Sequence, residues 1–181
     1  MGRLKALLPW NGVPLIEHQL AALHGGGVDR VVVVLGHEAQ QLQCLVEEKE
    51  GVAWVVNPDY AEGKTTSIKA GLKALGPSKL STLLVLNVDQ PRTAGTIRHL
   101  LQQHRQGHSL ITIPTYRGKG GHPLVLDLSL LDELGSIDED TLGLKAVVRR
   151  HQREAQRVEM DTPEVLLDLN TPEQYRAALG S

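Results

Sequence analysis

The chain has 181 residues, the length of one ordinary domain, and carries 19 lysines and arginines against 21 aspartates and glutamates, a formal net charge of −2. Its basic residues are scattered, which argues against nucleic acid or an acidic membrane as the main partner. The sequence contains no run of about 20 apolar residues to span a bilayer, and its start lacks a signal peptide's apolar run and cleavage site. We expect a single domain over residues 1–181, soluble and cytoplasmic.

Two features of the composition bear on the core. Aromatic residues make up only 3% of the chain and phenylalanine is absent, so aliphatic side chains must fill the interior, which favours layers of helices and aliphatic strands. The single cysteine, Cys44, cannot form an internal disulfide, in keeping with a reducing compartment. It lies in a segment with helical spacing, where we expect it to pack as a small residue.

Helical and strand patterns alternate along the chain. Each predicted strand is a short, nearly continuous aliphatic run, which is typical of strands buried on both faces. Two helices begin with proline, and glycine ends the first of them. In chain order we predict a helix between Pro14 and Gly25, strands over Arg30–Leu35 and Val52–Val56, a helix over Ser67–Leu75, a strand over Thr82–Val88, a helix over Thr93–His104, strands over Leu110–Ile113 and Pro123–Leu126, a helix over Gly143–His151, a strand over Val165–Leu169 and a helix over Thr171–Leu179.

This alternation predicts an α/β fold. Strands that alternate with helices form an open, mostly parallel sheet with helices on both faces, and ligands bind in the crevice at the carboxyl ends of the strands. Residues that directly follow a strand are therefore the first candidates for chemistry.

Asp89 follows the aliphatic run TLLVLNV and precedes a proline turn. A carboxylate in this place is presented to the crevice, where it could bind a metal. It could equally cap the helix that begins near Thr93. The residue alone does not decide between the two interpretations.

A second polar cluster lies in VLLDLNTPEQY. Strand alternation would put Asp168 and Asn170 on one side and Leu169 on the other, so two oxygen ligands could face the same crevice as Asp89. Oxygen ligands suit Mg²⁺, which binds few side chains and keeps waters and phosphate oxygens in its shell. The competing interpretation is that Asn170 ends the strand and Thr171 caps the helix. Lys5, near the start, could neutralise phosphates or be a solvated surface charge.

Five motifs together resemble one family. They are GRLKALLPWNGVPLIEHQL, NPDYAEGKTTSIKAGL, NVDQP, GGHPLVL and LLDLNTPEQY, and they occur in the order and spacing of the MobA-like nucleotidyltransferases. They are most similar to the molybdenum cofactor cytidylyltransferase branch, and the resemblance covers essentially the whole chain. It implies a Rossmann-like, three-layer α/β/α fold with a mostly parallel sheet.

The resemblance also implies roles for individual residues. Asp89 would hold Mg²⁺ together with Asn170 or its neighbour Asp168; the family usually has aspartate at the position of Asn170, and asparagine still offers a carbonyl oxygen. Lys5 would contact the triphosphate, and His122 would lie on the acceptor side. The family's loop beside the base and ribose corresponds here to Gly63, Thr65, Thr66 and Ser67.

The chain departs from the family at its start. Family members begin with a strand and a glycine-rich turn whose backbone N–H groups cradle phosphates, whereas this sequence begins just after that turn. We therefore expect a domain that is N-terminally truncated relative to the family, with a sheet that lacks the usual first strand. The triphosphate cradle would be incomplete unless a partner supplies it.

The implied reaction is transfer of CMP from CTP to a phosphorylated molybdopterin-type cofactor, with release of pyrophosphate. A molybdoenzyme or a chaperone is a possible protein partner. Two alternatives stay open: a related transferase that uses GTP or another phosphorylated acceptor, and a non-catalytic nucleotide-binding module or inactive fragment. The hydroxyl-rich GKTTSIKAG favours the cytidylyl branch.

Overall fold

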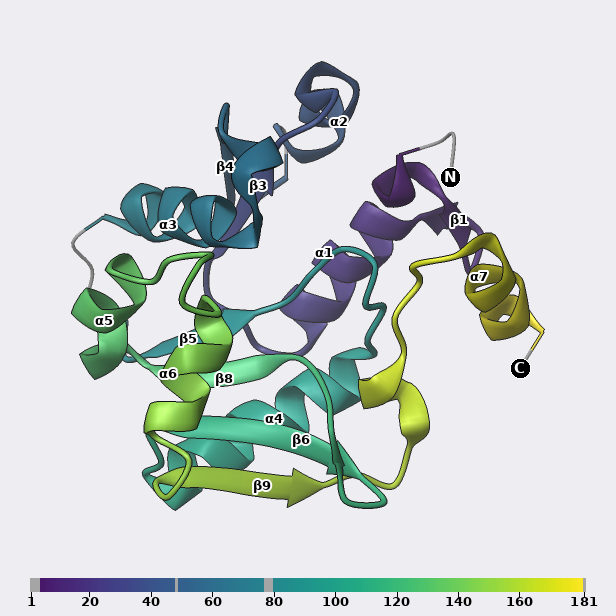
Figure 1. Ribbon diagram of the computed structural model, residues 1–181. Helices are drawn as coiled ribbons and strands as arrows, with labels where there is room; N and C mark the ends of the chain where they lie inside the picture. The colour runs from purple at the N-terminus through teal and green to yellow at the C-terminus, as the bar shows by residue number, and fades with distance from the viewer. Residues whose placement is uncertain (1–3, 48, 77–79, 181) are drawn as a thin grey trace.

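The computed structural model describes residues 4–47, 49–76 and 80–180. It is a mixed α/β structure in which the strands form two separate sheets beside a small hairpin (Figure 1). The hairpin pairs β1 (Pro9–Trp10) with β2 (Val13–Pro14) and follows a single 3₁₀ turn, η1 (Lys5–Leu7). Helix α1 (Leu15–Gly25) comes next and lies between the two sheets in Figure 1.

The larger sheet has the strand order β5-β8-β6, with β7 and β9 also paired to β6. Strands β5, β6 and β9 run in one direction, and β8 runs in the opposite direction between β5 and β6. The strands are β5 (Thr82–Val85), β6 (Ile111–Tyr116), β7 (Lys119–Gly120), β8 (Leu124–Asp127) and β9 (Ala155–Glu159).

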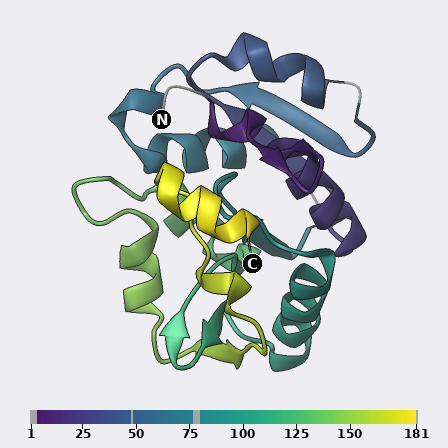
Figure 2. The same ribbon diagram turned by 90° about the vertical axis from the view of Figure 1, so that its right-hand side faces the viewer.

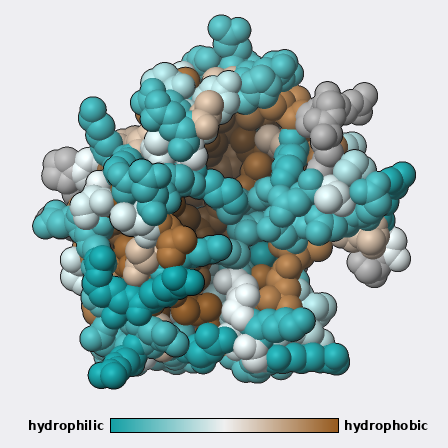
Figure 3. All heavy atoms as spheres, in the orientation of Figure 1, coloured by the Kyte–Doolittle hydropathy of each residue, from teal (hydrophilic) through white to brown (hydrophobic). Residues whose placement is uncertain are grey.

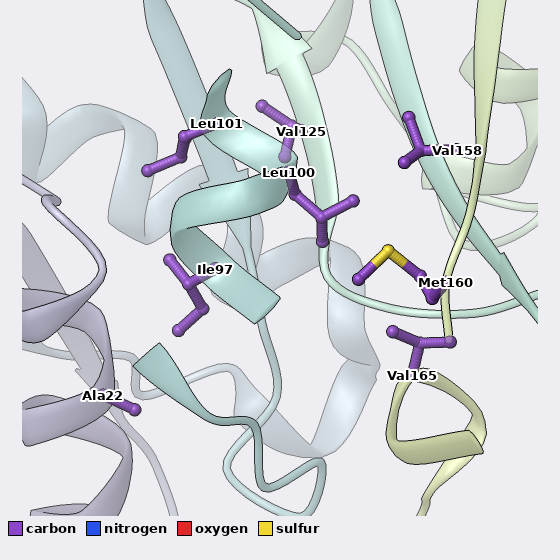
Figure 4. Close-up of a cluster of buried hydrophobic side chains, with 8 residues drawn as sticks. All are labelled: Ala22, Ile97, Leu100, Leu101, Val125, Val158, Met160 and Val165. Atoms are coloured by element: carbon purple, nitrogen blue, oxygen red, sulfur yellow. The ribbon is translucent and has the colours of Figure 1, made fainter. Parts of the chain in front are cut away.

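Helices cover both faces of this larger sheet, as the strand pattern predicts. On one face α4 (Ala94–Gly107) packs its apolar stripe against β8 and β9, and Figure 4 shows these side chains gathered around the helix. On the other face lie α5 (Leu131–Gly135), α6 (Leu144–Arg150) and the short turn η3 (Leu128–Leu130). Because successive strand residues point to opposite faces, Val125 belongs to the α4 cluster and Leu126 to the α5 and α6 cluster.

The smaller sheet pairs β3 (Val31–Leu35) with β4 (Val52–Val56) in parallel. Helix α2 (Ala39–Val46) connects the two strands and packs with α1 against β3, and α3 (Lys64–Leu75), preceded by the turn η2 (Tyr60–Glu62), contacts both strands. Cys44 is exposed on α2, so the expectation that it packs inside is wrong.

The two sheets are not joined by strand pairing. Among the described residues, β3 pairs only with β4 and β5 pairs only with β8, so each sheet has an open edge. Every residue of β5, and Val32 to Val34 of β3, is only half-buried although the strands are aliphatic. Figure 3 shows hydrophobic side chains in the hollowed centre of this face. The arrangement agrees with the expected sheet that lacks one strand.

The end of the chain differs from the sequence prediction. Val165–Leu169 is not a strand: the turn η4 (Pro163–Leu166) is followed by an extended segment that pairs with no strand of the described chain. The strand there is β9, with the sequence AQRVE, which is too polar to stand out as an aliphatic run. It is stabilised instead by parallel pairing with β6.

Helix α7 (Pro172–Leu179) ends the described chain. Thr171 caps this helix, as the sequence predicts, and the structure adds a capping box: Thr171 accepts from Gln174 N and the Gln174 side chain accepts from Thr171 N. Figure 2 shows α7 beside the segment of η1 and the β1–β2 hairpin, and the Tyr175 hydroxyl donates to the carbonyl of Pro9. Within residues 4–47, 49–76 and 80–180, no helix has the length and apolarity needed to cross a membrane.

Candidate functional site

Three polar residues from distant parts of the chain meet at one point. The Lys5 ammonium donates to Asp89 Oδ2 at 2.7 Å and to Asn170 Oδ1 at 2.9 Å. Lys5 lies in η1, Asp89 in the loop after β5, and Asn170 directly before α7. Two oxygen atoms thus converge on a single cation.

Backbone contacts hold this cluster together. Leu169 N donates to Asp89 O at 2.8 Å, so the segment that ends in Asn170 is tied to the loop of Asp89. The Leu169 side chain is fully buried and packs with Trp10 and Leu15, which lie in the hairpin and helix that follow Lys5. The apolar contact that anchors the C-terminal segment therefore also holds the segment that follows Lys5.

Asp168 and His122 are electrostatically linked to Asp89. Burial lowers the pKa of His122, as do the charges of Arg92 and Lys64, while the charges of Asp168 and Asp89 act in the opposite direction. The pKa of His122 therefore responds to the charges of both acidic residues and of Lys64, the first residue of α3. Asp168 acts on this region through its charge.

The Gly63–Ser67 loop forms the start of α3, and its donors are already engaged. The Glu139 carboxylate accepts from the Thr65 hydroxyl at 2.7 Å, from Thr65 N at 3.2 Å and from Lys64 N at 3.4 Å. These hydrogen bonds lower the pKa of Glu139, and the bond from the Thr65 hydroxyl has the largest effect. Gly63 has φ 128°, and a Cβ there would meet the Glu139 carboxyl carbon at 2.5 Å.

Asn57 holds the other two hydroxyls of this loop. It is 3% exposed, and its amide contacts Thr66 Oγ1 at 2.9 Å and Ser67 Oγ at 3.0 Å. Asn57 lies directly after β4, at the carboxyl end of a strand, which is the signal that could have identified it. The predicted base-and-ribose loop is thus held by hydrogen bonds on two sides. Asn57 binds it from the smaller sheet, and Glu139 binds it from the segment between α5 and α6.

The geometry agrees with the outcome of the family comparison. A family model described as "MobA-like NTP transferase domain" matches residues 1–155. The chain belongs to the MobA-like NTP transferase family.

The individual relatives of this MobA-like chain are named for different activities. It is 32% identical over 180 residues to nicotine blue oxidoreductase of Paenarthrobacter nicotinovorans, covering 95% of this chain and 86% of that protein. It is 24% identical over 179 residues to molybdenum cofactor cytidylyltransferase of Escherichia coli K12, covering 98% and 88%. The crystal structure of Rv0371c of Mycobacterium tuberculosis in complex with manganese superposes with a TM-score of 0.84, at 24% identity and with 99% and 94% coverage.

The donor set of this MobA-like transferase suits a divalent cation that is shared with a ligand. Asp89 and Asn170 both point an oxygen at the Lys5 ammonium, which shows that a positive charge is accommodated between them. In the parts of the chain that the structure describes, no three His, Cys, Asp or Glu residues gather as a metal cluster. A site with few protein ligands fits a divalent cation that completes its shell with water and with oxygens of the ligand.

Arg92 is a residue of the site region that the sequence interpretation missed. Its side chain is 1% exposed, although it follows the NVDQP motif directly. Burial lowers the pKa of Arg92 to about 10, although the charges of Glu164, Asp168 and Asp89 act to raise it. Gln19 of α1, also buried, donates to the carbonyls of Asn87 and Gln90 and accepts from Arg92 N, so the loop of Asp89 is bonded on both sides.

Proposed function

We propose that this chain transfers CMP from CTP to a phosphorylated molybdopterin-type acceptor, with release of pyrophosphate and with Mg²⁺ as the metal. The observation that carries the proposal is the convergence of Lys5, Asp89 and Asn170. Membership of a nucleotidyltransferase family supplies the reaction class. The cytidylyltransferase of Escherichia coli, which is 24% identical, supports the choice of nucleotide and acceptor.

In the proposed reaction, an oxygen of the acceptor phosphate attacks the α-phosphorus of CTP. The new bond joins this oxygen to the α-phosphorus, and the bond from the α-phosphorus to the bridging oxygen breaks, so pyrophosphate leaves with its electron pair. The attacking phosphate is an anion near neutral pH and needs no general base. Catalysis then depends on alignment and on neutralising charge.

Each residue of the cluster has a place in this scheme. Asp89, with Asn170 or Asp168, would hold Mg²⁺, which supplies positive charge to the phosphates when bound. Lys5 would donate to the triphosphate and stabilise the leaving pyrophosphate. His122 would lie beside the acceptor.

The nucleotide base and ribose are assigned to the start of α3. In this proposal Gly63, Thr65, Thr66 and Ser67 form the loop beside them, and the Glu139 carboxylate gives up its contacts with Thr65 when the nucleotide enters. The hydroxyl-rich sequence of the loop supports CTP over GTP.

Removing the Asp89 carboxylate tests the proposal. Asp89→Ala should lower pyrophosphate release from CTP by about 100-fold or more, because charge stabilisation by a metal is worth several kcal/mol and each ~1.4 kcal/mol is tenfold. The matched control is Asp127→Ala, which removes a carboxylate at the end of β8 that pairs with the first residue of β5 and so lies at the opposite end of that strand from Asp89. Equal turnover of Asp89→Ala and the parent would refute the metal assignment.

Asn170→Asp tests the second ligand. It restores the residue that the family usually has, and the added charge should keep or strengthen the dependence on Mg²⁺. A folded Asn170→Asp protein that loses activity would mean that this position requires a neutral side chain.

The nucleotide is tested by thermal protection with Mg²⁺ present. CTP should raise the melting temperature more than GTP, since a ligand at a hundredfold excess over its Kd stabilises by about 2.7 kcal/mol. A larger shift with GTP would assign the guanylyl reaction. Protection by CTP without pyrophosphate release in the presence of any phosphorylated acceptor would favour a binding module. Oxidoreductase activity on nicotine blue would favour the activity named in the 32% identical relative.

A further inference from the structure

Arg92 is a buried cation that binds only main-chain carbonyl oxygens among its described hydrogen-bond partners. Its guanidinium donates to Pro91 O at 2.7 Å, His122 O at 2.8 Å, Val165 O at 3.0 Å and Leu167 O at 3.1 Å. A buried arginine is costly unless its donors are satisfied, so this ring of carbonyls is a fixed part of the fold.

The carbonyls of His122, Val165 and Leu167 belong to segments that are far from Arg92 in the sequence. His122 lies between β7 and β8, and Val165 and Leu167 lie in and after η4, on the way to Asp168 and Asn170. Arg92 itself follows Asp89 by three residues. One side chain therefore joins the candidate metal ligand, the candidate acceptor residue and the C-terminal ligand segment.

Close backbone approach gives this junction a defined geometry. His122 N also donates to Val165 O at 2.9 Å, and a Cβ on Gly121 would meet Val165 O at 2.2 Å. Only glycine fits there, and the planar guanidinium bridges the two segments at the point where they touch. On the far side of the same loop, Gln19 accepts from Arg92 N at 3.2 Å.

We propose that Arg92 is a positioning residue for nucleotidyl transfer: its bonds to the carbonyls of His122, Val165 and Leu167 fix the acceptor side of the site relative to Asp89. This inference rests on the proposed function. The nucleotide loop at Gly63–Ser67 is bonded to Asn57 and Glu139 instead, so Arg92 sets the alignment of acceptor and donor and leaves nucleotide binding unchanged.

Two substitutions separate the charge from the geometry. Arg92→Lys keeps a positive charge but offers three donors on one atom in place of a planar fork of five, and Arg92→Met removes both. We expect kcat to fall about 10-fold in Arg92→Lys and about 100-fold in Arg92→Met, with the KM for CTP unchanged, because a misplacement of about 1 Å can cost about 100-fold.

Hydrogen exchange gives a readout that needs no turnover. Leu169 N, which is bonded to Asp89 O, should exchange at least about 10-fold faster in Arg92→Lys, while Leu100 N in the middle of α4 keeps its parental rate. The matched control is Arg30→Lys, since Arg30 also donates to main-chain carbonyls, those of Ala74 and Leu75, but is exposed and lies away from the site. It should change neither readout.

The outcomes are distinct. If the parent fails to turn over CTP with any acceptor, the proposed function fails, and the exchange of Leu169 N still tests Arg92. The positioning role is overturned if Leu169 N keeps its parental protection in Arg92→Lys, or if Leu100 N loses protection to the same degree. It is also overturned if kcat is unchanged, or if the KM for CTP rises in place of a fall in kcat. Failure of both Arg92 variants to fold would overturn it too, because a purely structural role predicts that failure.

Discussion

Strands β8 and β5 are neighbours with similarly aliphatic sequences, yet they are buried to different extents. In β8 the residues Leu124, Val125 and Leu126 are buried, the last two completely. In β5 every residue is half-buried. Strand β8 has a partner on each side, whereas β5 is paired on one side only within the described chain. Burial is therefore decided by the neighbours that a strand has, and not by its composition.

The strands of the smaller sheet, like β5, are aliphatic but incompletely buried. Strand β3 buries only its two end residues, Val31 and Leu35, and β4 buries none, although α1, α2 and α3 pack around them. The open edges of β3 and β5 bound the hollow in Figure 3. The candidate site lies at this seam, since Asp89 follows β5 and Asn57 follows β4.

Matched leucine truncations should show the largest difference. Leu126 of β8 and Leu83 of β5 are directly opposite each other and pack in the same cluster, but Leu126 is fully buried and Leu83 is half-buried. Leu126→Ala should lower the free energy of unfolding by about 2–5 kcal/mol, and Leu83→Ala by clearly less. Urea denaturation measures both. Equal losses would mean that the hollow beside β5 is as well packed as the rest of the core.

Filling the open edges should raise the stability of the smaller sheet. A chain extended upstream of Met1 by an aliphatic strand and a glycine-rich turn should melt several degrees higher, because ~1 kcal/mol shifts the melting temperature of a domain of this size by about 2–4 °C. It should also bind CTP more tightly through added backbone N–H donors. A Gly-Ser extension of the same length is the control. If both extensions behave like the parent, no strand is accommodated between β3 and β5.

Glu139 connects the two parts of the molecule, and its removal should have a smaller effect. Glu139→Ala frees Lys64 N, Thr65 N and the Thr65 hydroxyl, so Mg²⁺-CTP should bind several-fold more tightly in calorimetry. Asp140→Ala, in the same loop, is the control. Weaker binding by Glu139→Ala would show instead that Glu139 preorganises the loop.

The smallest effects concern pH, and two histidines beside the larger sheet should act in opposite directions. Burial lowers the pKa of His104, so its contribution to stability is present above pH ~6.5 and is lost as the pH falls through its folded pKa. Hydrogen bonds to Glu133 and then Glu154 raise the pKa of His151, so its contribution is present below pH ~6.5 and is lost as the pH rises through its folded pKa.

Melting temperatures between pH 5 and 9 test these signs. His104→Gln should flatten the acidic side of the profile, and His151→Gln the alkaline side. A flattening on the wrong side in either variant would contradict the assignment of that histidine.

Local patterns were sufficient for much of the fold. Helices α1, α3, α4, α6 and α7 and strands β3, β4 and β8 fall where periodicity, caps and aliphatic runs predict them. Strand β9 could not be found in this way, because its sequence AQRVE is polar and it is held by pairing with β6. The prediction of a strand over Val165–Leu169 was wrong for the opposite reason: this segment has the composition of a strand but no strand partner in the described chain.

The sequence by itself determined the family, the α/β class and the polar residues at the ends of aliphatic runs, since these depend on spacing along the chain. Only the tertiary structure decided which of them meet: Lys5 contacts Asp89 and Asn170 across separations of 84 and 165 residues. Arg92 and Glu139 carry no local signal at all. Their roles arise because burial satisfies the guanidinium of one with distant carbonyls, and because the fold brings the carboxylate of the other to the start of α3.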